Sequence, residues 1–252
     1  MVQLRELTSY CDDLLEADRF RDYCPNGLQV EGSGQVSKIV TGVTASQALI
    51  DAAIEAEADV LLVHHGYFWK GEDARVVGVK KQRIASLLDA GISLVAYHLP
   101  LDAHPVYGNN VQLAQVLDIS VEGRLQEGAE PAVGLYGRLD KPMSGKAFAQ
   151  HIAGALGREP LHIDNRAQEV STVAWCTGAA QGYIEQAIEL GVDAYITGEV
   201  SEPTVHIARE TGIHFYAAGH HATERYGAKA LGEHLAANFG IDQQFIDIDN
   251  PV

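Results

Sequence analysis

Asp59-Val-Leu-Leu-Val-His-His-Gly66 gives the clearest indication of the fold class in this chain. Its apolar residues predict a buried strand, and the abrupt change to two histidines and a glycine marks the point where that strand ends. Ser93-Leu-Val-Ala-Tyr-His98 and His214-Phe-Tyr-Ala-Ala-Gly219 repeat the pattern and lead into further polar residues. In open α/β sheets, ligands bind beyond the carboxyl ends of the strands. The three stretches therefore predict an α/β fold with a functional site at the strand ends.

Helical segments alternate with these strands. We expect one helix over residues 46–57, with Ser46 as its N-cap, and another over residues 80–90 that stops at Gly91. Strands that alternate with helices in this way favour a mostly parallel sheet built from βαβ units. The last segment, 245–250, predicts a short terminal strand.

An internal repeat indicates how the chain is organised. Residues 43–65 align without a gap over residues 177–199, and each window ends where a strand is expected to end. The alignment predicts two related α/β subdomains produced by internal duplication. Identical pairs in it are Ala45/Ala179, Gln47/Gln181, Ile50/Ile184, Ala53/Ala187, Ile54/Ile188, Glu55/Glu189 and Asp59/Asp193.

The boundary between the two subdomains is expected near residues 120–145, which are rich in glycine and proline. We therefore predict a first unit over 1–124 and a second over 125–252, with the alternative that the last helix and strand pack back on the first unit. The simplest architecture turns the polar strand ends of both units toward one cleft, which would hold the functional site.

The composition is that of a globular protein, with 252 residues, 46% of them hydrophobic. Its formal charge of −16 opposes non-specific binding to nucleic acid, which depends on Lys and Arg. No signal peptide or apolar span is recognisable, so we expect a cytoplasmic protein with no membrane partner. Cys11, Cys24 and Cys176 lack C-x-x-C spacing and are expected to be reduced, inert thiols.

The polar residues at the three strand ends have the chemistry of metal ligands. His64 and His65 close the first strand, and Asp102 follows the second after Pro100, which predicts an extended loop. In the third group, His220 and Glu224 would lie one turn apart on a helix. Spacing alone does not decide between His220 and its neighbour His221.

Imidazole and carboxylate groups without thiolate suit Zn, Mn, Fe, Co or Ni in a catalytic rather than a structural site. These candidates exceed what one open catalytic ion needs, so we predict two divalent ions, about 3.5–4 Å apart. Such a pair would generate a bridging hydroxide near neutral pH, which makes hydrolysis the expected chemistry. His98 and His104 flank Asp102 and could be ligands, outer partners of the ligands or substrate contacts.

Residues that could contact a substrate are less distinctive. The phosphate-binding motif G-x-x-x-x-G-K-[ST] is absent from the sequence. Four cations could contact phosphates or be surface charges, namely Lys70, Lys80, Lys81 and Arg225. Three aromatic residues could stack on a base or pack under a loop, namely Tyr67, Phe68 and Trp69.

Four motifs in order resemble the Nif-three-like family in its short bacterial form, also called the type 2 GTP cyclohydrolase-like family. The likeness runs over essentially the whole chain. The motifs are Asn26-Gly-Leu-Gln-Val-Glu-Gly32, Asp59-Val-Leu-Leu-Val-His-His-Gly66, His98-Leu-Pro-Leu-Asp102 with Tyr107-Gly-Asn-Asn110, and Gly219-His-His-Ala-Thr-Glu-Arg225.

The resemblance implies a two-domain α/β fold, a dinuclear metal centre and a homohexameric ring. It also implies hydrolysis of the GTP cyclohydrolase type, acting on a nucleotide or related small molecule. The alternative is a non-enzymatic metal-binding hexamer that serves as a scaffold or regulatory interaction partner. Carried over by position, the family's metal ligands, which include His220 rather than His221, fall on His64, His65, Asp102, His220 and Glu224.

Overall fold

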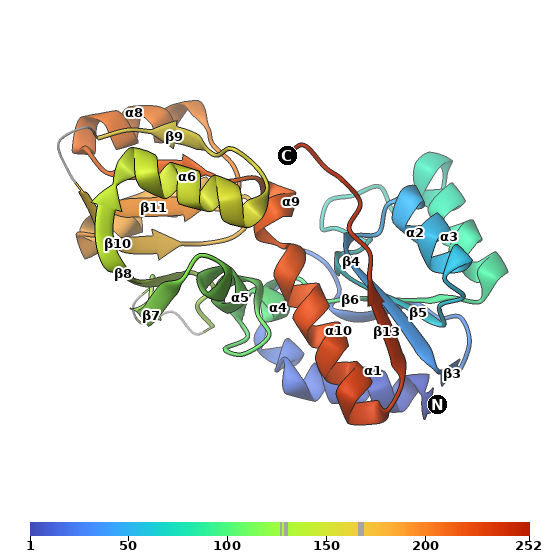
Figure 1. Ribbon diagram of the computed structural model, residues 1–252. Helices are drawn as coiled ribbons and strands as arrows, with labels where there is room; N and C mark the ends of the chain where they lie inside the picture. Colours follow the sequence, from blue (N-terminus) through green and yellow to red (C-terminus); the bar gives the residue numbers. More distant parts are fainter. Residues whose placement is uncertain (127, 129–130, 166–168) are drawn as a thin grey trace. The chain divides into compact units, whose positions relative to one another are not determined.

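The computed structural model describes residues 1–126, 128, 131–165 and 169–252, and the chain divides into two compact units (Figure 1). Both are mixed α/β units, which confirms the predicted fold class. Unit 1 comprises Met1–Gly108 and Gly227–Asp249, and unit 2 comprises Asn109–Tyr226 and Asn250–Val252. The chain thus returns to unit 1 near its end, as in the alternative in which the last helix and strand pack on the first unit.

Unit 1 is built from the following elements: β1 (Val2–Gln3), α1 (Leu4–Leu14), η1 (Ala17–Arg19), β2 (Gly27–Val30), β3 (Gln35–Val36), β4 (Lys38–Thr44), α2 (Gln47–Glu55), β5 (Val60–His65), α3 (Gly78–Ala90), β6 (Ser93–Ala96), α4 (Leu99–Ala103), most of α10 (Arg225–Phe239) and β13 (Asp242–Phe245).

The main sheet of unit 1 has the strand order β13-β4-β5-β6-β2, in which only β2 is antiparallel to its neighbour. Hydrophobic side chains of β5 alternate between two cores. Val60 and Leu62 pack with α1 and α10, whereas Leu61 and Val63 pack with α2 and α3. The sheet is therefore covered by helices on both faces, which explains why its strands are apolar throughout.

Unit 2 is built from the following elements: α5 (Asn109–Val116), β7 (Ile119–Arg124), β8 (Leu135–Ser144), α6 (Gly145–Leu156), β9 (Leu161–Ile163), β10 (Glu169–Trp175), η2 (Gln181–Tyr183), α7 (Ile184–Leu190), β11 (Ala194–Thr197), α8 (Glu202–Thr211), β12 (His214–Ala217) and α9 (His220–Thr223).

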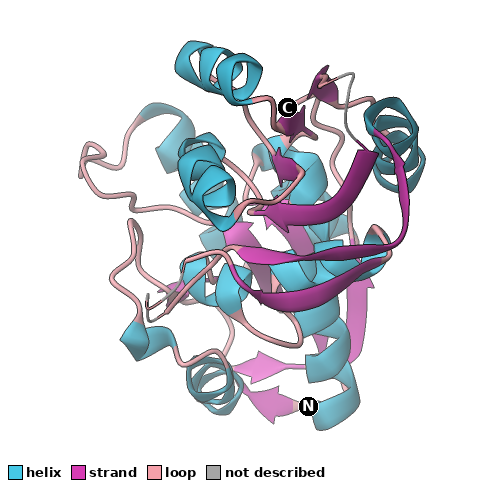
Figure 2. Ribbon diagram, turned by 90° about the vertical axis from the view of Figure 1, so that its left-hand side faces the viewer, coloured by secondary structure: helices cyan, strands magenta, loops and turns pink. Residues whose placement is uncertain are grey.

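The sheet of unit 2 has the order β7-β8-β10-β11-β12-β9, with β10, β11 and β12 parallel. Helices again cover both of its faces (Figure 2). Trp175 and Ile196 pack with α5 and α6, while Tyr195 and Phe215 pack with α7 and α8. Both units thus bury their parallel strands between helices on the two faces of the sheet.

The change of unit lies at Gly108/Asn109, whereas the sequence predicted it at residues 124/125. Strand β7 pairs with β8, and β8 pairs with β10, so residues 119–124 and 135–144 belong to the sheet of unit 2. The glycines and prolines of this region accompany the β7–β8 connection inside one unit instead of a linker between two.

The central parts of the two units share one topology. Each has three parallel strands joined by helices, β4-α2-β5-α3-β6 and β10-α7-β11-α8-β12, and an antiparallel strand beside the third. Asp59 Oδ2 accepts hydrogen bonds from the N–H groups of Ser37 and Lys38, and Asp193 Oδ2 accepts the same bonds from Ser171 and Thr172. These shared features support the duplication inferred from the sequence.

Local signals explain most element bounds. The Ser46 hydroxyl accepts a hydrogen bond from Leu49 N–H at 3.3 Å and caps α2, as predicted. Gly91 ends α3 in the left-handed conformation at φ 68°. The terminal strand lies at Asp242–Phe245, earlier than the expected 245–250.

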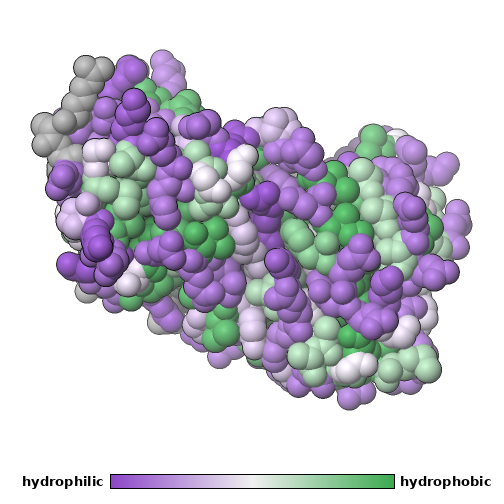
Figure 3. Space-filling model, in the orientation of Figure 1, coloured by the Kyte–Doolittle hydropathy of each residue, from purple (hydrophilic) through white to green (hydrophobic). Residues whose placement is uncertain are grey.

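The surface and the cysteines add little to this description of the fold. Polar residues are spread over the visible surface, with apolar residues between them (Figure 3). Among the helices that the structure describes, none is long and apolar enough to cross a membrane. All three cysteines are buried and stand outside any disulfide, and burial raises the pKa of Cys24 to about 12, in keeping with inert thiols.

Candidate metal centre

His64 is the most deeply held of the predicted ligands. Its side chain is fully buried at the carboxyl end of β5. The ring Nδ1 lies 2.9 Å from the carbonyl oxygen of Tyr97, and because a carbonyl only accepts, Nδ1 carries the proton. In the neutral ring Nε2 is then unprotonated, which is the state in which imidazole binds a metal. This Nε2 lies 3.4 Å from Asp102 Oδ1.

His65 completes the end of the strand. Its Nδ1 lies 3.1 Å from Thr44 Oγ1, on the neighbouring strand. Neighbouring residues on a regular strand point to opposite faces, yet the rings of His64 and His65 have centroids only 4.5 Å apart. Their position at the last residues of β5 therefore brings both imidazoles together.

Asp102 lies in a short helix, which corrects one prediction. The sequence predicted an extended loop because of Pro100, but Leu99–Ala103 form α4 with the proline in its first turn. Proline is tolerated there because the first N–H groups of a helix have no intrahelical partner. The helix buries Asp102, and its carboxylate faces His64.

His98 caps the start of α4 and is held by an aspartate from the first part of the chain. Its Nδ1 lies 2.7 Å from Asp22 Oδ1, and its backbone N–H donates to Asn26 Oδ1 at 2.7 Å. Burial opposes ionisation of Asp22, but the hydrogen bonds from His98 and Asn26 outweigh it and lower its pKa. The ring centroid of His98 lies 5.1 Å from that of His64, so His98 borders the ligand pair.

His104 has a structural position. Its Nδ1 accepts hydrogen bonds from the N–H groups of Val106 and Tyr107, at 3.2 and 2.9 Å. The ring also stacks on Tyr107, and burial lowers the pKa of its imidazole. These contacts fix the loop after α4, so His104 supports the chain that follows Asp102.

His220 and Glu224 form the corresponding group in unit 2. Gly219, at φ 103°, leads from β12 into the short helix α9, which begins at His220. His220 Nε2 lies 3.2 Å from Glu224 Oε2, and Nδ1 lies 2.7 Å from Glu199 Oε1. A carboxylate on each side of the ring identifies His220, rather than His221, as the histidine paired with Glu224.

Close packing around this pair depends on a glycine. A Cβ atom at Gly178 would lie 2.1 Å from Glu224 Oε1, so no other residue leaves room for the buried carboxylate. Gly178 also has φ 69°, which other residues rarely adopt. Burial disfavours the charged form of His220, but Glu224 and Glu199 outweigh it and raise the pKa of this histidine to about 9.

The side chains fit divalent metal ions in type and spacing. Each unit contributes imidazole and carboxylate groups, and no thiolate is among the five predicted ligands. The 3.4 Å and 3.2 Å separations between nitrogen and oxygen are close to those of two ligand atoms on one ion, given bond lengths of about 2.0–2.2 Å. His64, His65 and Asp102 belong to unit 1, whereas His220 and Glu224 belong to unit 2.

The three aromatic residues that follow β5 lie in different surroundings. Tyr67 is buried and donates a hydrogen bond to the Ala45 carbonyl, so it packs in the core. Phe68 lies under the ammonium group of Lys80, at 4.9 Å from the ring centroid. Trp69 is the member nearest the histidines, with its ring centroid 5.0 Å from that of His98.

Two residues of the site were missed from the sequence. Asp22 reaches His98 across a long sequence separation, and no local pattern marks it. Glu199 had a signal, because the internal repeat aligns it with His65, but its role was not assigned. Among the proposed phosphate contacts, Lys80 pairs with Glu72 at 2.9 Å, and Arg225 donates to the Leu156 carbonyl at 2.6 Å.

Comparison with known proteins adds a family match. The model of the family described as Duf34/NIF3 (NGG1p interacting factor 3) matches residues 2–251. A Pseudomonas aeruginosa protein named "GTP cyclohydrolase 1 type 2 homolog" is 61% identical over 250 residues, which are 99% of each chain. An Escherichia coli (strain K12) protein of the same name is 53% identical over 247 residues, or 98% of each chain.

Solved structures match over the full length. The structure of ybgI, a protein described as of unknown function, is 52% identical, with a TM-score of 0.96 and 100% of both chains covered. A protein from Thermus thermophilus is 34% identical, with a TM-score of 0.89 and 100% of both chains covered.

Proposed function

The chain belongs to the Duf34/NIF3 family, and we propose that it is a dinuclear metal protein that hydrolyses a nucleotide or related small molecule. Its two divalent ions, of the group Zn, Mn, Fe, Co and Ni, would be bound by imidazole and carboxylate side chains. The relatives named as GTP cyclohydrolase homologues support the hydrolytic interpretation. The proposed ligands are His64, His65, Asp102, His220 and Glu224.

The observation that carries the proposal is the environment of the His64 ring, which leaves one of its nitrogens available to bind a metal. The Tyr97 carbonyl fixes the proton on Nδ1, and the buried Asp102 carboxylate lies beside Nε2. A buried carboxylate beside an unprotonated imidazole nitrogen is a pair of donor atoms that a divalent cation can bind.

The residues of the chain divide the work around the ions. Glu199 and Glu224 hold the His220 ring from both sides, and Asp22 holds His98 next to His64 and His65. When bound, such ions act as Lewis acids and lower the pKa of a water molecule, which is the chemistry a hydrolase needs. Trp69 and His98 border the histidine pair and are the side chains available to contact a substrate there.

Metal analysis of protein purified without added metal tests the proposal, followed by turnover assays with nucleotides. We expect two ions per chain, and metal-dependent turnover that is lost in Asp102→Ala and in Glu224→Ala. Each variant should weaken metal binding by more than the roughly 10–100-fold typical of an outer-sphere change. Matched controls are Asp89→Ala and Glu233→Ala, which alter exposed carboxylates of α3 and α10.

The two kinds of failure have separate meanings. Full metal content in both ligand variants would remove the ligand assignment. A metal-loaded protein that is inert on nucleotides, phosphoesters and amides would remove the hydrolase and leave a metal-binding protein.

A non-enzymatic role is the second candidate, favoured by the family description, which names an interacting factor. In this case the chain forms a metal-binding homohexameric ring in the cytoplasm that acts as a scaffold. Light scattering should then give the mass of six chains, each of 27.2 kDa. Partners captured from a lysate should change on chelation and in Glu224→Ala, whereas unchanged partners would argue against metal-gated binding.

A further inference from the structure

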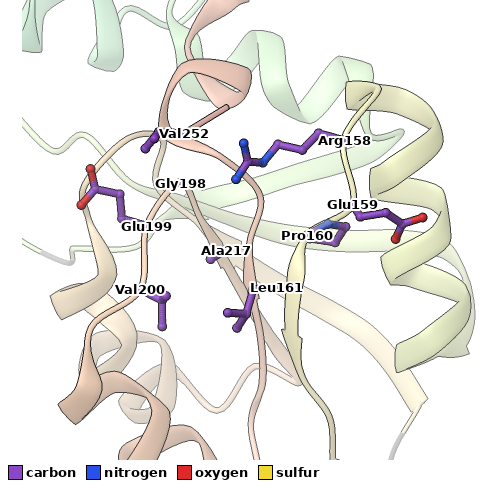
Figure 4. A pocket seen from close by; sticks show the side chains of 9 residues that line it. All are labelled: Arg158, Glu159, Pro160, Leu161, Gly198, Glu199, Val200, Ala217 and Val252. Carbon is purple, nitrogen blue, oxygen red and sulfur yellow. The ribbon is translucent and has the colours of Figure 1, made fainter. Parts of the chain in front are cut away.

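The described residues of unit 2 line an open pocket of about 600 Å³ (Figure 4). Gly198 and Glu199, which follow β11, line it together with Ala217, the last residue of β12. The carboxyl ends of neighbouring parallel strands are the usual place for ligands in such sheets. The volume also lies within the range of small-molecule sites, about 300–1,000 Å³.

One side of the pocket is apolar. Leu161, Val200 and Ala217 line it, and Leu161 keeps 47% of its surface exposed. An exposed leucine in a concave site gains stabilisation when a ligand covers it, at about 25 cal/mol per Å² of apolar surface. The apolar side therefore suits the hydrocarbon part of a small molecule.

Arg158 is the only cation among the residues that line the pocket. Its side chain reaches toward Val252 and lies against Gly219, where a Cβ atom would be 2.8 Å from Nε (Figure 4). Nη1 donates a hydrogen bond to the Pro251 carbonyl, which shows that an acceptor oxygen fits at this guanidinium. Nε is shielded from solvent, so a ligand does not reach it. The donors left for a ligand are those of Nη2, because Nη1 is the guanidinium nitrogen that binds the Pro251 carbonyl.

The charges around Arg158 select the kind of anion. A guanidinium binds carboxylates and phosphates equally well in geometry. Two carboxylates, Glu159 and Glu199, line the same pocket, so its lining carries one more negative than positive charge. A doubly charged phosphate is therefore opposed more strongly than a singly charged carboxylate.

We propose that this pocket binds a small carboxylate-bearing molecule, with the carboxylate on Arg158 and its hydrocarbon part against Leu161 and Val200. Glu199 joins the pocket to the metal ligands, because it lines the pocket and hydrogen-bonds His220. A molecule anchored here therefore lies beside Glu199, which holds a proposed metal ligand. The carboxylate site itself does not rest on the proposed function.

Binding of 4-methylpentanoate, followed by NMR titration of the purified full-length protein, tests the proposal. Two matched probes are its neutral amide and 3-methylbutylphosphonate, which is more highly charged. We expect the carboxylate to bind at least about tenfold more tightly than either, because only it offers a singly charged acceptor pair. Equal binding of the three probes, or no binding of the carboxylate, overturns the proposal.

Variants locate the site. Arg158→Gln should weaken carboxylate binding at least about tenfold, whereas Arg209→Gln, on the exposed side of α8, should leave it unchanged. Leu161→Glu changes an exposed position and adds a third carboxylate to the two of Glu159 and Glu199, so it should also abolish binding if Arg158→Gln fails to fold. Unchanged binding in a folded Arg158→Gln or Leu161→Glu overturns the site.

Metal content, measured on the same samples, separates the two proposals. Carboxylate binding in protein that takes up no metal leaves this site standing and removes the metal function. Normal metal content without carboxylate binding does the reverse.

Discussion

Unit 1 and unit 2 share three parallel strands with the same connections, but they end those strands with different chemistry. At the end of the middle strand, unit 1 carries His65 where unit 2 carries Glu199 in the internal repeat. After the third strand both units carry a histidine with an acid four residues later, His98 with Asp102 and His220 with Glu224. The carboxylate that holds the histidine is Asp22 in one unit and Glu199 in the other.

The difference shows that a strand end supplies a position rather than a role. At the end of the middle strand, unit 1 has a proposed ligand, whereas unit 2 has a carboxylate that orients a ligand. The acid after the third strand faces a different histidine in each unit, since Asp102 lies beside His64 and Glu224 beside His220. The two units therefore share the arrangement of strands and helices, whereas the residues at the corresponding strand ends have different roles.

The largest expected effect concerns what the units share. Asp59→Ala and Asp193→Ala each remove a carboxylate that accepts three hydrogen bonds at the start of a sheet. Because N–H and O–H groups then lose a charged acceptor, we expect each variant to lower the free energy of unfolding by about 2–4 kcal/mol. Urea denaturation followed by circular dichroism measures the loss.

Equal losses of unfolding free energy would show that both units are stabilised by the same kind of carboxylate hydrogen bonding. Asp89→Ala, at an exposed position, serves as the control and should stay within about 0.5 kcal/mol of the parent. A large loss in only one of the two variants would break the equivalence of the units.

A pH effect is expected in unit 2 of the metal-free protein. The pKa of His220 is raised to about 9, so its folded-state pKa lies above the unfolded value of about 6.5. The stabilisation is then fully present below about pH 6.5 and is lost as the pH rises through about 9. Its size is of the order of 2–3 kcal/mol, to be measured as a fall in melting temperature between pH 6.5 and 9.5.

Metal should remove this dependence, because an ion on His220 replaces the proton. Glu224→Gln should reduce the pH effect in the metal-free protein, since it removes the main charge that favours the protonated ring. A pH profile that is identical in Glu224→Gln and the parent would contradict this origin.

The sequence predicted the strands and their ends well because both are local features. Four apolar residues before His64 decide a strand, and the repeat places Asp59 over Asp193. The sequence-based prediction failed where the structure depends on distant contacts or on residues that are compatible with more than one conformation. Pro100 indicates a break, yet it also fits the first turn of α4, and Asp22 reaches His98 only through the folded chain. The boundary at Gly108 depends on strand pairing, which no turn former reveals.

A smaller effect separates the two orienting carboxylates. Glu199→Ala removes the acceptor for Nδ1 of His220, so the ring loses the contact that fixes its orientation and tautomer. We expect metal affinity to fall by about 10–100-fold, with partial rescue in Glu199→Gln, whose side chain still accepts a hydrogen bond. Titration with metal measures the affinity, and ¹⁵N shifts of His220 report the tautomer. Unchanged shifts in Glu199→Ala would contradict the assigned role.

The smallest effect is expected for the matching residue of unit 1. Asp22→Ala removes the partner of His98, which is not a proposed ligand, so metal affinity should change by less than about threefold while Glu199→Ala changes it far more. The pKa of Asp22 is lowered, because hydrogen bonds outweigh burial, so its stabilisation is present above the unfolded pKa and lost as the pH falls through the lower folded value. Metal titration and acid unfolding of Asp22→Ala test both points. A loss of affinity as large as that of Glu199→Ala would make His98 a ligand, and the two units would then use their third strand ends in the same way.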